Sequence, residues 1–309
     1  MSEAELLTEV RDGVGYLTLN RPRAINALTV AMMHGMRDTL AAWADDDAVT
    51  SVELSGAGER GLCAGADVRA LRDAVLQGRD YGEFFDLEYG LDLMIADYPK
   101  PYVAHQRGIT MGGGLGVSAH GSRRIAYPDT AFAMPETIIG FTPDVGIAWF
   151  LAHAPGQTGT HVALTGATVG ARDGVALGLA DEVEGDAAPG TLEADREWID
   201  ACYAFEDAAQ VIAALENHPD PRARAAGADL RLRSPLSVAV TLEALRRVPG
   251  MTGVADVLDQ DRRLAEHMIG SPDFAEGVRA QLVDKDKRPR WSHARIEDVT
   301  RAEVEACFR

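Results

Sequence analysis

The 309-residue sequence lacks any run of apolar residues long enough to span a membrane, and it has few cysteines. Cys63, Cys202 and Cys307 are odd in number and far apart, so neither a disulfide framework nor a metal-binding spacing is predicted, and buried, unreactive thiols are expected. The first ten residues are acidic. They do not show the basic segment followed by an apolar segment that is typical of a signal peptide. We therefore expect a cytoplasmic protein without a bound metal or membrane attachment.

Basic residues are scarce relative to acidic ones. The chain has 30 Lys and Arg against 48 Asp and Glu, which gives a formal net charge of -18. Such an excess argues against nucleic acid or an anionic membrane as a partner, because both would repel it. It still permits a small anionic ligand held by a local group of arginines. The length and the 46% hydrophobic fraction are ordinary for a globular protein with a sizeable core.

Strand-like and helix-like patterns divide the chain into two parts. The first part begins with a hairpin that turns at Asp12-Gly13, and short apolar strands then follow among amphipathic helices such as residues 29–44. Beyond about residue 190 only helical spacing is found, in segments separated by prolines. The expected helices of this part are residues 208–217, 237–247, 254–268 and 274–282. We expect an α/β core over residues 1–195 that carries the functional site, and a helical region over residues 196–309.

Three consecutive glycines, Gly112–Gly114, follow an apolar strand. Glycine loses the most backbone freedom on ordering, so such a run is unfavourable inside a regular strand or helix. It suits a place where the chain turns into a helix close to a ligand, because the first N–H groups of a helix are unpaired and the helix dipole is positive there. The run therefore predicts backbone hydrogen-bond donors at a binding site.

Two acids, Glu136 and Asp144, follow in an otherwise apolar segment. Apolar surroundings disfavour the charged form of a carboxyl group, which raises its pKa toward the range of an acid–base catalyst. Each acid could instead cap a helix or pair with a cation, and Asp144 directly precedes a helix expected from Val145. The glycine run favours catalysis, because acyl chemistry needs donors where oxyanion charge develops.

Other candidate motifs are weaker. The glycine spacing of Gly56–Gly61 matches that of a dinucleotide-binding loop, but the residues that follow are predicted to be loop and not the helix that such a site requires. A loop that shapes a pocket wall is therefore favoured over a nicotinamide site. Ser118 lacks the second flanking glycine of a nucleophile elbow, and we expect it to pack inside a helix. His105 and His120 are isolated, and structural roles are expected for both.

Motifs along nearly the whole chain carry a family resemblance. Leu17–Pro22, Cys63–Val68 and the glycine run are similar to the crotonase (enoyl-CoA hydratase/isomerase) superfamily. Within it, the chain resembles the 3-hydroxyisobutyryl-CoA hydrolase branch through Gly108–Gly114, Ala133–Thr137, Pro143–Gly146, Ser234–Ser237, Thr241–Leu245, Asp273–Arg279, Asp284–Lys287 and Trp291. The resemblance implies an α/β spiral of repeated ββα units followed by a C-terminal helical domain.

The resemblance also implies roles for individual residues. The N–H groups of Ala66 and Gly113 would form an oxyanion hole for a thioester carbonyl, and Glu136 and Asp144 would be the catalytic and substrate-binding acids. The residues implied to bind the acyl-CoA substrate are Glu88, Gly112, Arg21, Arg23, Ala64, Asp67 and Val68. The two arginines are the expected cations for the CoA phosphates. No cofactor is needed, because coenzyme A is part of the substrate.

Position 116 distinguishes between the reactions of the superfamily. Hydratases carry a glutamate there, paired with one at position 136, whereas this chain has Gly116, which has no side chain to transfer a proton. The resemblance therefore favours hydrolysis of a short 3-hydroxyacyl-CoA such as 3-hydroxyisobutyryl-CoA, a step of valine catabolism. An enoyl-CoA hydratase or isomerase that uses Glu136 and Asp144 is the alternative within enzymes. A CoA-ester-binding protein without turnover is the alternative outside them.

Two properties stay open at this point. The connection 181–207 looks shorter than is usual for the branch, and it could border the acyl pocket, so the acyl group is not defined. Trimers are common in the superfamily, which leaves a homo-oligomer open, but the sequence does not show an interface.

Overall fold

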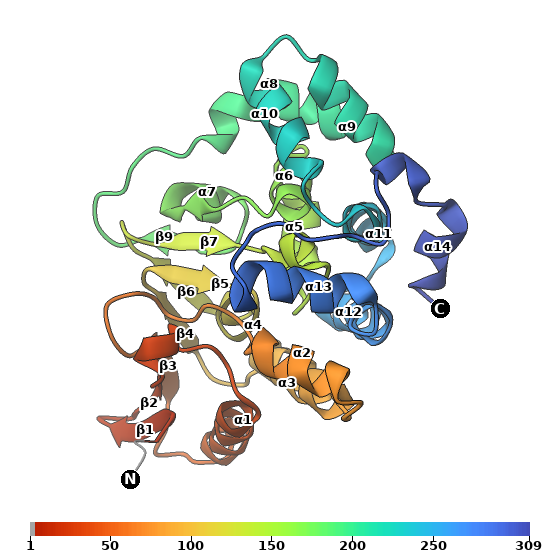
Figure 1. The fold of residues 1–309 in the computed structure, drawn as a ribbon. Coiled ribbons are helices and arrows are strands. Elements are labelled where there is room, and N and C mark those ends of the chain that lie inside the picture. Colours follow the sequence, from red (N-terminus) through yellow and green to blue (C-terminus); the bar gives the residue numbers. More distant parts are fainter. Residues whose placement is uncertain (1–3) are drawn as a thin grey trace. The chain divides into compact units, whose positions relative to one another are not determined.

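The computed structural model describes residues 4–309 (Figure 1). Met1–Glu3 belong to the N-terminal stretch for which no signal peptide is predicted, and they lie outside the described residues. The chain forms two compact units. The first, here called the sheet unit, consists of the chain up to Asp67, Glu83–Ala133 and Val169–Gly190. The second, the helical unit, consists of Val68–Gly82, Met134–Thr168 and Thr191–Arg309. A functional boundary at residue 195 stays a prediction.

Within the described chain, the sheet unit has a six-stranded sheet in the order β1-β2-β3-β4-β6-β9. Its strands are β1 (Leu6–Arg11), β2 (Val14–Leu19), β3 (Ser51–Gly56), β4 (Tyr102–Gln106), β6 (Arg123–Ala126) and β9 (Glu182–Val183). β1 and β2 form the predicted antiparallel hairpin, and the other neighbours pair in parallel. Alternate residues of the inner strands are buried, as Leu17 and its register partner Leu54 show, so one face of these strands belongs to the core.

A second, three-stranded sheet of the described chain holds β5 (Ile109–Met111), β7 (Ala131–Ala133) and β8 (Val169–Gly170) in the order β5-β7-β8. β5 also pairs with the loop that follows β3. Cys63 N–H donates to Ile109 O at 3.1 Å, and Met111 N–H donates to Cys63 O at 3.0 Å. These bonds place the loop after β3 beside the strand that leads into the glycine run.

The helices of the sheet unit connect its strands. They are α1 (Val30–Ala44), α3 (Gly82–Ala96), α4 (Gly113–Ala119) and α7 (Ala171–Ala176). α1 begins as expected, because the side chain of Thr29 accepts a hydrogen bond from Met32 N–H. Near its other end, Trp43 packs on β2 so closely that a side-chain carbon at Gly15 would lie 2.6 Å from its ring. Glycine at this position therefore lets the helix approach the sheet.

The helical unit contains the helices of the C-terminal half and some from earlier in the chain. They are α2 (Val68–Leu76), α5 (Ile147–His153), α6 (Thr158–Thr165), α8 (Leu192–Tyr203), α9 (Ala208–Asn217), α10 (Pro221–Leu230), α11 (Pro235–Arg247), α12 (Val254–Met268), α13 (Pro272–Val278) and α14 (Arg301–Ala306). The predicted helical character beyond residue 190 is confirmed, but α8, α10 and α14 are additional helices. Pro221 is the first residue of α10, where Asp220 is the cap.

Nowhere in residues 4–309 is a helix both long enough and apolar enough to cross a membrane.

The contact between Gly15 and Trp43 generates a stability prediction. Gly15→Ala should lower the free energy of unfolding by about 1–3 kcal/mol, because the added methyl group overlaps the buried indole. Gly90→Ala is the matched control: Gly90 is exposed within α3, and nothing lies within 4 Å of an added carbon, so about 0.5–1 kcal/mol of stabilisation is expected. Urea unfolding of both variants measures the difference. Equal stability of the two variants would contradict the described packing.

Candidate active site

Backbone N–H groups of two loops lie close together in the sheet unit. Ala66 forms a parallel bridge with Leu28, in which Leu28 N–H donates to Gly65 O at 2.9 Å and Asp67 N–H donates to Leu28 O at 3.1 Å. Gly113 is the first residue of α4, where N–H groups have no partner within the helix. A side-chain carbon at Gly113 would lie 3.5 Å from Ala66 N. The two residues predicted to donate to one carbonyl are thus neighbours.

The glycine run is required by backbone geometry and by close contacts. Gly112 has φ +50° and precedes α4, a conformation that L side chains rarely adopt. A side chain at Gly113 would overlap the carboxylate of Glu88, and one at Gly114 would overlap Cys63. Glu88 itself is only 2% exposed on α3. The structure therefore places Gly113, the predicted oxyanion-hole donor, together with Gly112 and Glu88, which are predicted to bind substrate, in one small region beside Ala66.

Asn26 fixes the loop that carries Ala66. This side chain is fully buried, and its Nδ2 donates to Ala57 O at 3.0 Å and to Gly61 O at 3.1 Å, while its Oδ1 accepts from Arg21 N–H at 2.9 Å. Its φ of +54° is one that asparagine tolerates better than most residues. This anchoring role of Asn26 is recognised only from the structure.

The arginines and the other residues predicted to bind CoA have varied surroundings. The Arg21 guanidinium donates to Ala27 O at 2.6 Å and lies 3.3 Å from both Asp67 Oδ2 and Glu5 Oε1. Arg23 and Ala64 are exposed, and Val68 begins α2. Arg21 is thus already held by two carboxylates, whereas Arg23 offers a solvent-exposed cation. The contacts of all of these residues with CoA stay predictions.

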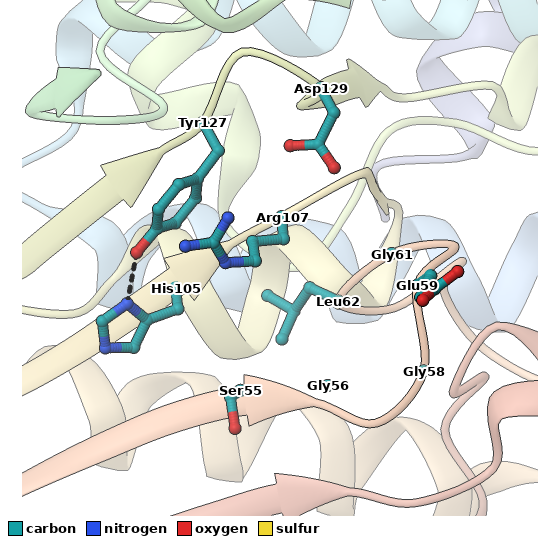
Figure 2. Close-up of a pocket in the computed structure, with 10 residues that line it drawn as sticks. All are labelled: Ser55, Gly56, Gly58, Glu59, Gly61, Leu62, His105, Arg107, Tyr127 and Asp129. Carbon is teal, nitrogen blue, oxygen red and sulfur yellow. Dashed lines mark hydrogen bonds between the residues drawn. The ribbon is translucent and has the colours of Figure 1, made fainter. Parts of the chain in front are cut away.

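A separate pocket of about 440 Å³ lies in the sheet unit (Figure 2). Gly56–Leu62 contributes one wall, as the sequence predicts, and the ten lining residues include none of the predicted site residues. His105 Nδ1 is 2.8 Å from the Tyr127 hydroxyl and its Nε2 is 3.3 Å from Glu53 Oε2, while the Arg107 guanidinium lies 3.4 Å from the centre of the Tyr127 ring. His105 therefore takes part in a side-chain network that lines this pocket, and its structural role stays a prediction.

The predicted inert residues are buried. Ser118 Oγ donates to Gly114 O at 2.7 Å within α4 and accepts from Gln106 Nε2 at 3.1 Å, which confirms that it packs inside the helix. The three cysteines are free and buried, as expected, and burial raises the pKa of Cys63 to about 12. Within residues 4–309 no group of His, Cys, Asp or Glu is arranged to hold a metal ion.

Glu136 begins a 3₁₀ turn, Glu136–Ile139, in the helical unit, and it is 7% exposed. The turn ends at Gly140, whose φ is +76° and where an added side chain would overlap the backbone of Asp273. Thr137 Oγ1 donates to Leu164 O at 3.1 Å. The position of Glu136 is thus fixed by segments more than twenty residues away in the chain.

Asp144, also 7% exposed, lies in a turn of left-handed backbone. Val145 has φ +52° and Gly146 has φ +74°. For a β-branched residue this conformation costs about 1–2 kcal/mol, so the surroundings must hold it. α5 begins at Ile147 and its cap residue is Gly146. The helix does not start at Val145 with Asp144 as its cap, because the left-handed turn intervenes.

An acid outside the predicted set, Asp261 of α12, contacts this turn. Its Oδ2 accepts a hydrogen bond from Gly146 N–H at 2.8 Å, and its side chain is 1% exposed. Burial, and then the negative charge of Asp144, raise the pKa of Asp261 well above its usual range, while the Gly146 hydrogen bond partly opposes this. One signal for Asp261 was present in the sequence, since it occupies the apolar stripe of its helix between Leu258 and Leu264.

Comparisons with known proteins agree with this organisation. The enoyl-CoA hydratase/isomerase family model matches residues 14–188 and 181–308. The mitochondrial 3-hydroxyisobutyryl-CoA hydrolase of Gallus gallus is 36% identical, over 100% of this chain and 89% of that protein. The crystal structure of a carnitinyl-CoA dehydratase from Mycobacterium thermoresistibile is 42% identical, with a TM-score of 0.96 over 99% of this chain and 97% of that chain.

The crystal structure of an enoyl-CoA hydratase from Rhodobacter sphaeroides 2.4.1 is 35% identical, with a TM-score of 0.95 and the same two coverages. These likenesses confirm the predicted α/β fold with a helical C-terminal region. The names of the relatives, however, describe both thioester hydrolysis and the addition or removal of water.

The raised pKa of Asp261 predicts how stability depends on pH. Between the unfolded-state pKa of about 3.9 and the higher folded-state pKa, the folded protein binds more protons, so the free energy of unfolding falls as pH rises. Asp261→Asn cannot ionise and escapes this loss. The Tm of the variant minus that of the wild type should therefore be larger near pH 8 than near pH 4.5, as measured by thermal unfolding.

Asp259→Asn is the control, because it removes one negative charge from an exposed position of the same helix. A Tm difference for Asp261→Asn that stays constant with pH, or that shrinks as pH rises, would contradict the assignment.

Proposed function

This chain belongs to the enoyl-CoA hydratase/isomerase superfamily, and from that premise we propose that it hydrolyses the thioester of a short 3-hydroxyacyl-CoA such as 3-hydroxyisobutyryl-CoA. The observation that carries the proposal is Gly116 in place of the second glutamate of a hydratase. Gly116 is buried inside α4, so the chain supplies no side chain there to move a proton. A 36% identical relative that is named as a 3-hydroxyisobutyryl-CoA hydrolase supports the same choice.

In the proposed mechanism, the N–H groups of Ala66 and Gly113 donate to the thioester carbonyl oxygen. Both groups are held by the backbone, so they need no reorganisation as negative charge develops on that oxygen. Loss of one such donor typically costs roughly 3–4 kcal/mol of barrier. The support for this role is the closeness of the two residues and the absence of a side chain at Gly113.

Glu136 acts on the carbonyl carbon in one of two ways. As a nucleophile, its carboxylate forms a mixed anhydride and CoA leaves as the thiolate; water then cleaves the anhydride and regenerates the carboxylate. As a general base, it takes a proton from the attacking water. Asp144 orients the substrate hydroxyl or that water. The burial of both acids supports these roles, because a solvent-exposed carboxylate would be fully hydrated.

The carboxylate of Glu88 lies beside Gly113, which supports a role for it in binding the acyl group. Arg23, exposed near the loop that carries Ala64, is the candidate cation for a CoA phosphate. Arg21 supports the same loop through Asp67 and the Ala27 carbonyl. In this proposal coenzyme A is part of the substrate.

A hydratase or dehydratase of the superfamily is the second candidate. It is favoured by the 42% identical structure, which is described as a carnitinyl-CoA dehydratase. A CoA-ester-binding protein without turnover is the third. The three differ in whether a free thiol, a change in enoyl absorbance, or neither appears.

A substrate panel tests the proposal. The wild-type chain should release free CoA thiol from 3-hydroxyisobutyryl-CoA and other short 3-hydroxyacyl-CoA esters, faster than from plain acyl-CoA esters. Glu136→Gln should lower kcat by about 10²–10⁴-fold, because it removes the group that attacks or activates water, while binding of the CoA ester changes little. Glu197→Gln, at an exposed position of α8, is the matched control.

Mass spectrometry of protein quenched during turnover distinguishes the two roles of Glu136, since only a nucleophile carries an acyl group. Enoyl absorbance that changes without thiol release would establish the second candidate. Tight binding of CoA esters without either signal would establish the third, and full activity of Glu136→Gln would remove Glu136 from the mechanism.

A further inference from the structure

A carboxyl group from the C-terminal half of the chain holds the turn that carries Asp144. Asp261 and Gly146 are 115 residues apart, and Gly146 N–H donates to Asp261 Oδ2 at 2.8 Å. Gly146 caps α5, so its N–H has no partner within that helix. Asp261 is 1% exposed and is fixed on a fifteen-residue helix, α12, whose neighbouring side chains on the same stripe are buried. The acceptor is therefore rigid and excluded from solvent.

The turn itself would not keep its form without such support. Val145 and Gly146 are both left-handed, at φ +52° and +74°, and a valine rarely adopts that conformation. Backbone of this kind persists where the surrounding structure over-determines it, and it is concentrated at functional sites. Asp144 immediately precedes Val145. The backbone conformation of Val145 and Gly146 therefore sets the direction in which the Asp144 side chain points.

We infer that Asp261 is a positioning residue, which holds the turn 144–146 in its left-handed form through Gly146 N–H and thereby orients Asp144. The inference rests on the proposed function, in which Asp144 orients the substrate hydroxyl or the attacking water. Asp261 acts through the turn and does not itself contact the substrate.

Charge explains why a buried acid is compatible with this role. Two carboxylates near each other in a buried region repel, so the pair is most stable when one of them is neutral. Burial and the charge of Asp144 raise the pKa of Asp261, which favours the neutral form of Asp261. Its other oxygen, Oδ1, is buried and has no hydrogen-bond partner within residues 4–309. When Asp261 is neutral, one of its oxygens carries the proton and the other is a carbonyl oxygen. The hydrogen bond from Gly146 N–H needs only that carbonyl oxygen as its acceptor.

A neutral acceptor predicts that asparagine can replace Asp261. Asp261→Asn keeps a carbonyl oxygen for Gly146 N–H, and its kcat should stay within about threefold of the wild-type value. Asp261→Ala removes the acceptor, and kcat should fall by about 10–100-fold with KM changed less than threefold, because Asp144 is misdirected while CoA binding is unaffected. Asp259→Ala, exposed on the same helix, should match the wild type.

A double variant separates positioning from a general loss of structure. Glycine adopts left-handed backbone readily, so Val145→Gly removes the penalty that Asp261 offsets. Combined with Asp261→Ala, it should restore at least part of the lost kcat. A purely structural role for Asp261 would give no such rescue, because Val145→Gly also removes a buried side chain.

Hydrogen exchange of the Gly146 amide tests the inference without an activity assay. The amide should be protected in the wild type and in Asp261→Asn, and should exchange at least about tenfold faster in Asp261→Ala. Rapid exchange in the wild type would overturn the inference, even if Asp261→Ala did not fold. Wild-type kcat in folded Asp261→Ala, or an equal loss of kcat in Asp261→Asn, would also overturn it. If the wild type hydrolyses no CoA thioester, the proposed function fails, and the exchange data alone decide whether Asp261 holds the turn.

Discussion

The close approach of two backbone segments at Ala66 and Gly113 is the constraint on which this account depends. An added side-chain carbon would overlap the Cys63 backbone at Gly114, and at Gly113 it would displace the carboxylate of Glu88. The bridge between Leu28 and Ala66, and the hydrogen bonds of Cys63 with β5, fix both segments, so the proposed donors would keep their direction without help from a ligand. Electrostatic stabilisation of an oxyanion is most effective when its donors are arranged in advance.

The acids depend on a different kind of support. Glu136 and Asp144 lie on short irregular turns, each of which ends in left-handed glycine backbone, at Gly140 and Gly146. Such turns have little intrinsic stability, and here they are held by partners distant in sequence, among them the Asp273 backbone and the Asp261 carboxyl group. Two helices of the C-terminal half, α12 and α13, thus contribute to the candidate site, because they fix the two turns that carry the acids.

Features with a local cause could be predicted from the sequence. The Asp12-Gly13 hairpin, the helix capped by Thr29 and the turn at the glycine run all follow from neighbouring residues, and the structure contains each of them. The pairing of Ala66 with Gly113 needed the family resemblance, because no local pattern brings the two loops together. α8 was missed because many charged residues interrupt its apolar stripe. Asp261 was missed because its partner Gly146 is 115 residues away.

The most direct test of the central claim is the carbonyl stretching frequency of a bound thioester. A 3-hydroxyacyl-CoA labelled with ¹³C at the carbonyl, bound to the Glu136→Gln variant, isolates this band in difference infrared spectra. If two backbone N–H groups donate to the oxygen, the bond is polarised and the band lies at a lower frequency than for the same thioester in water. A band at or above the frequency in water would show that the amides do not hold the carbonyl, and would contradict the account.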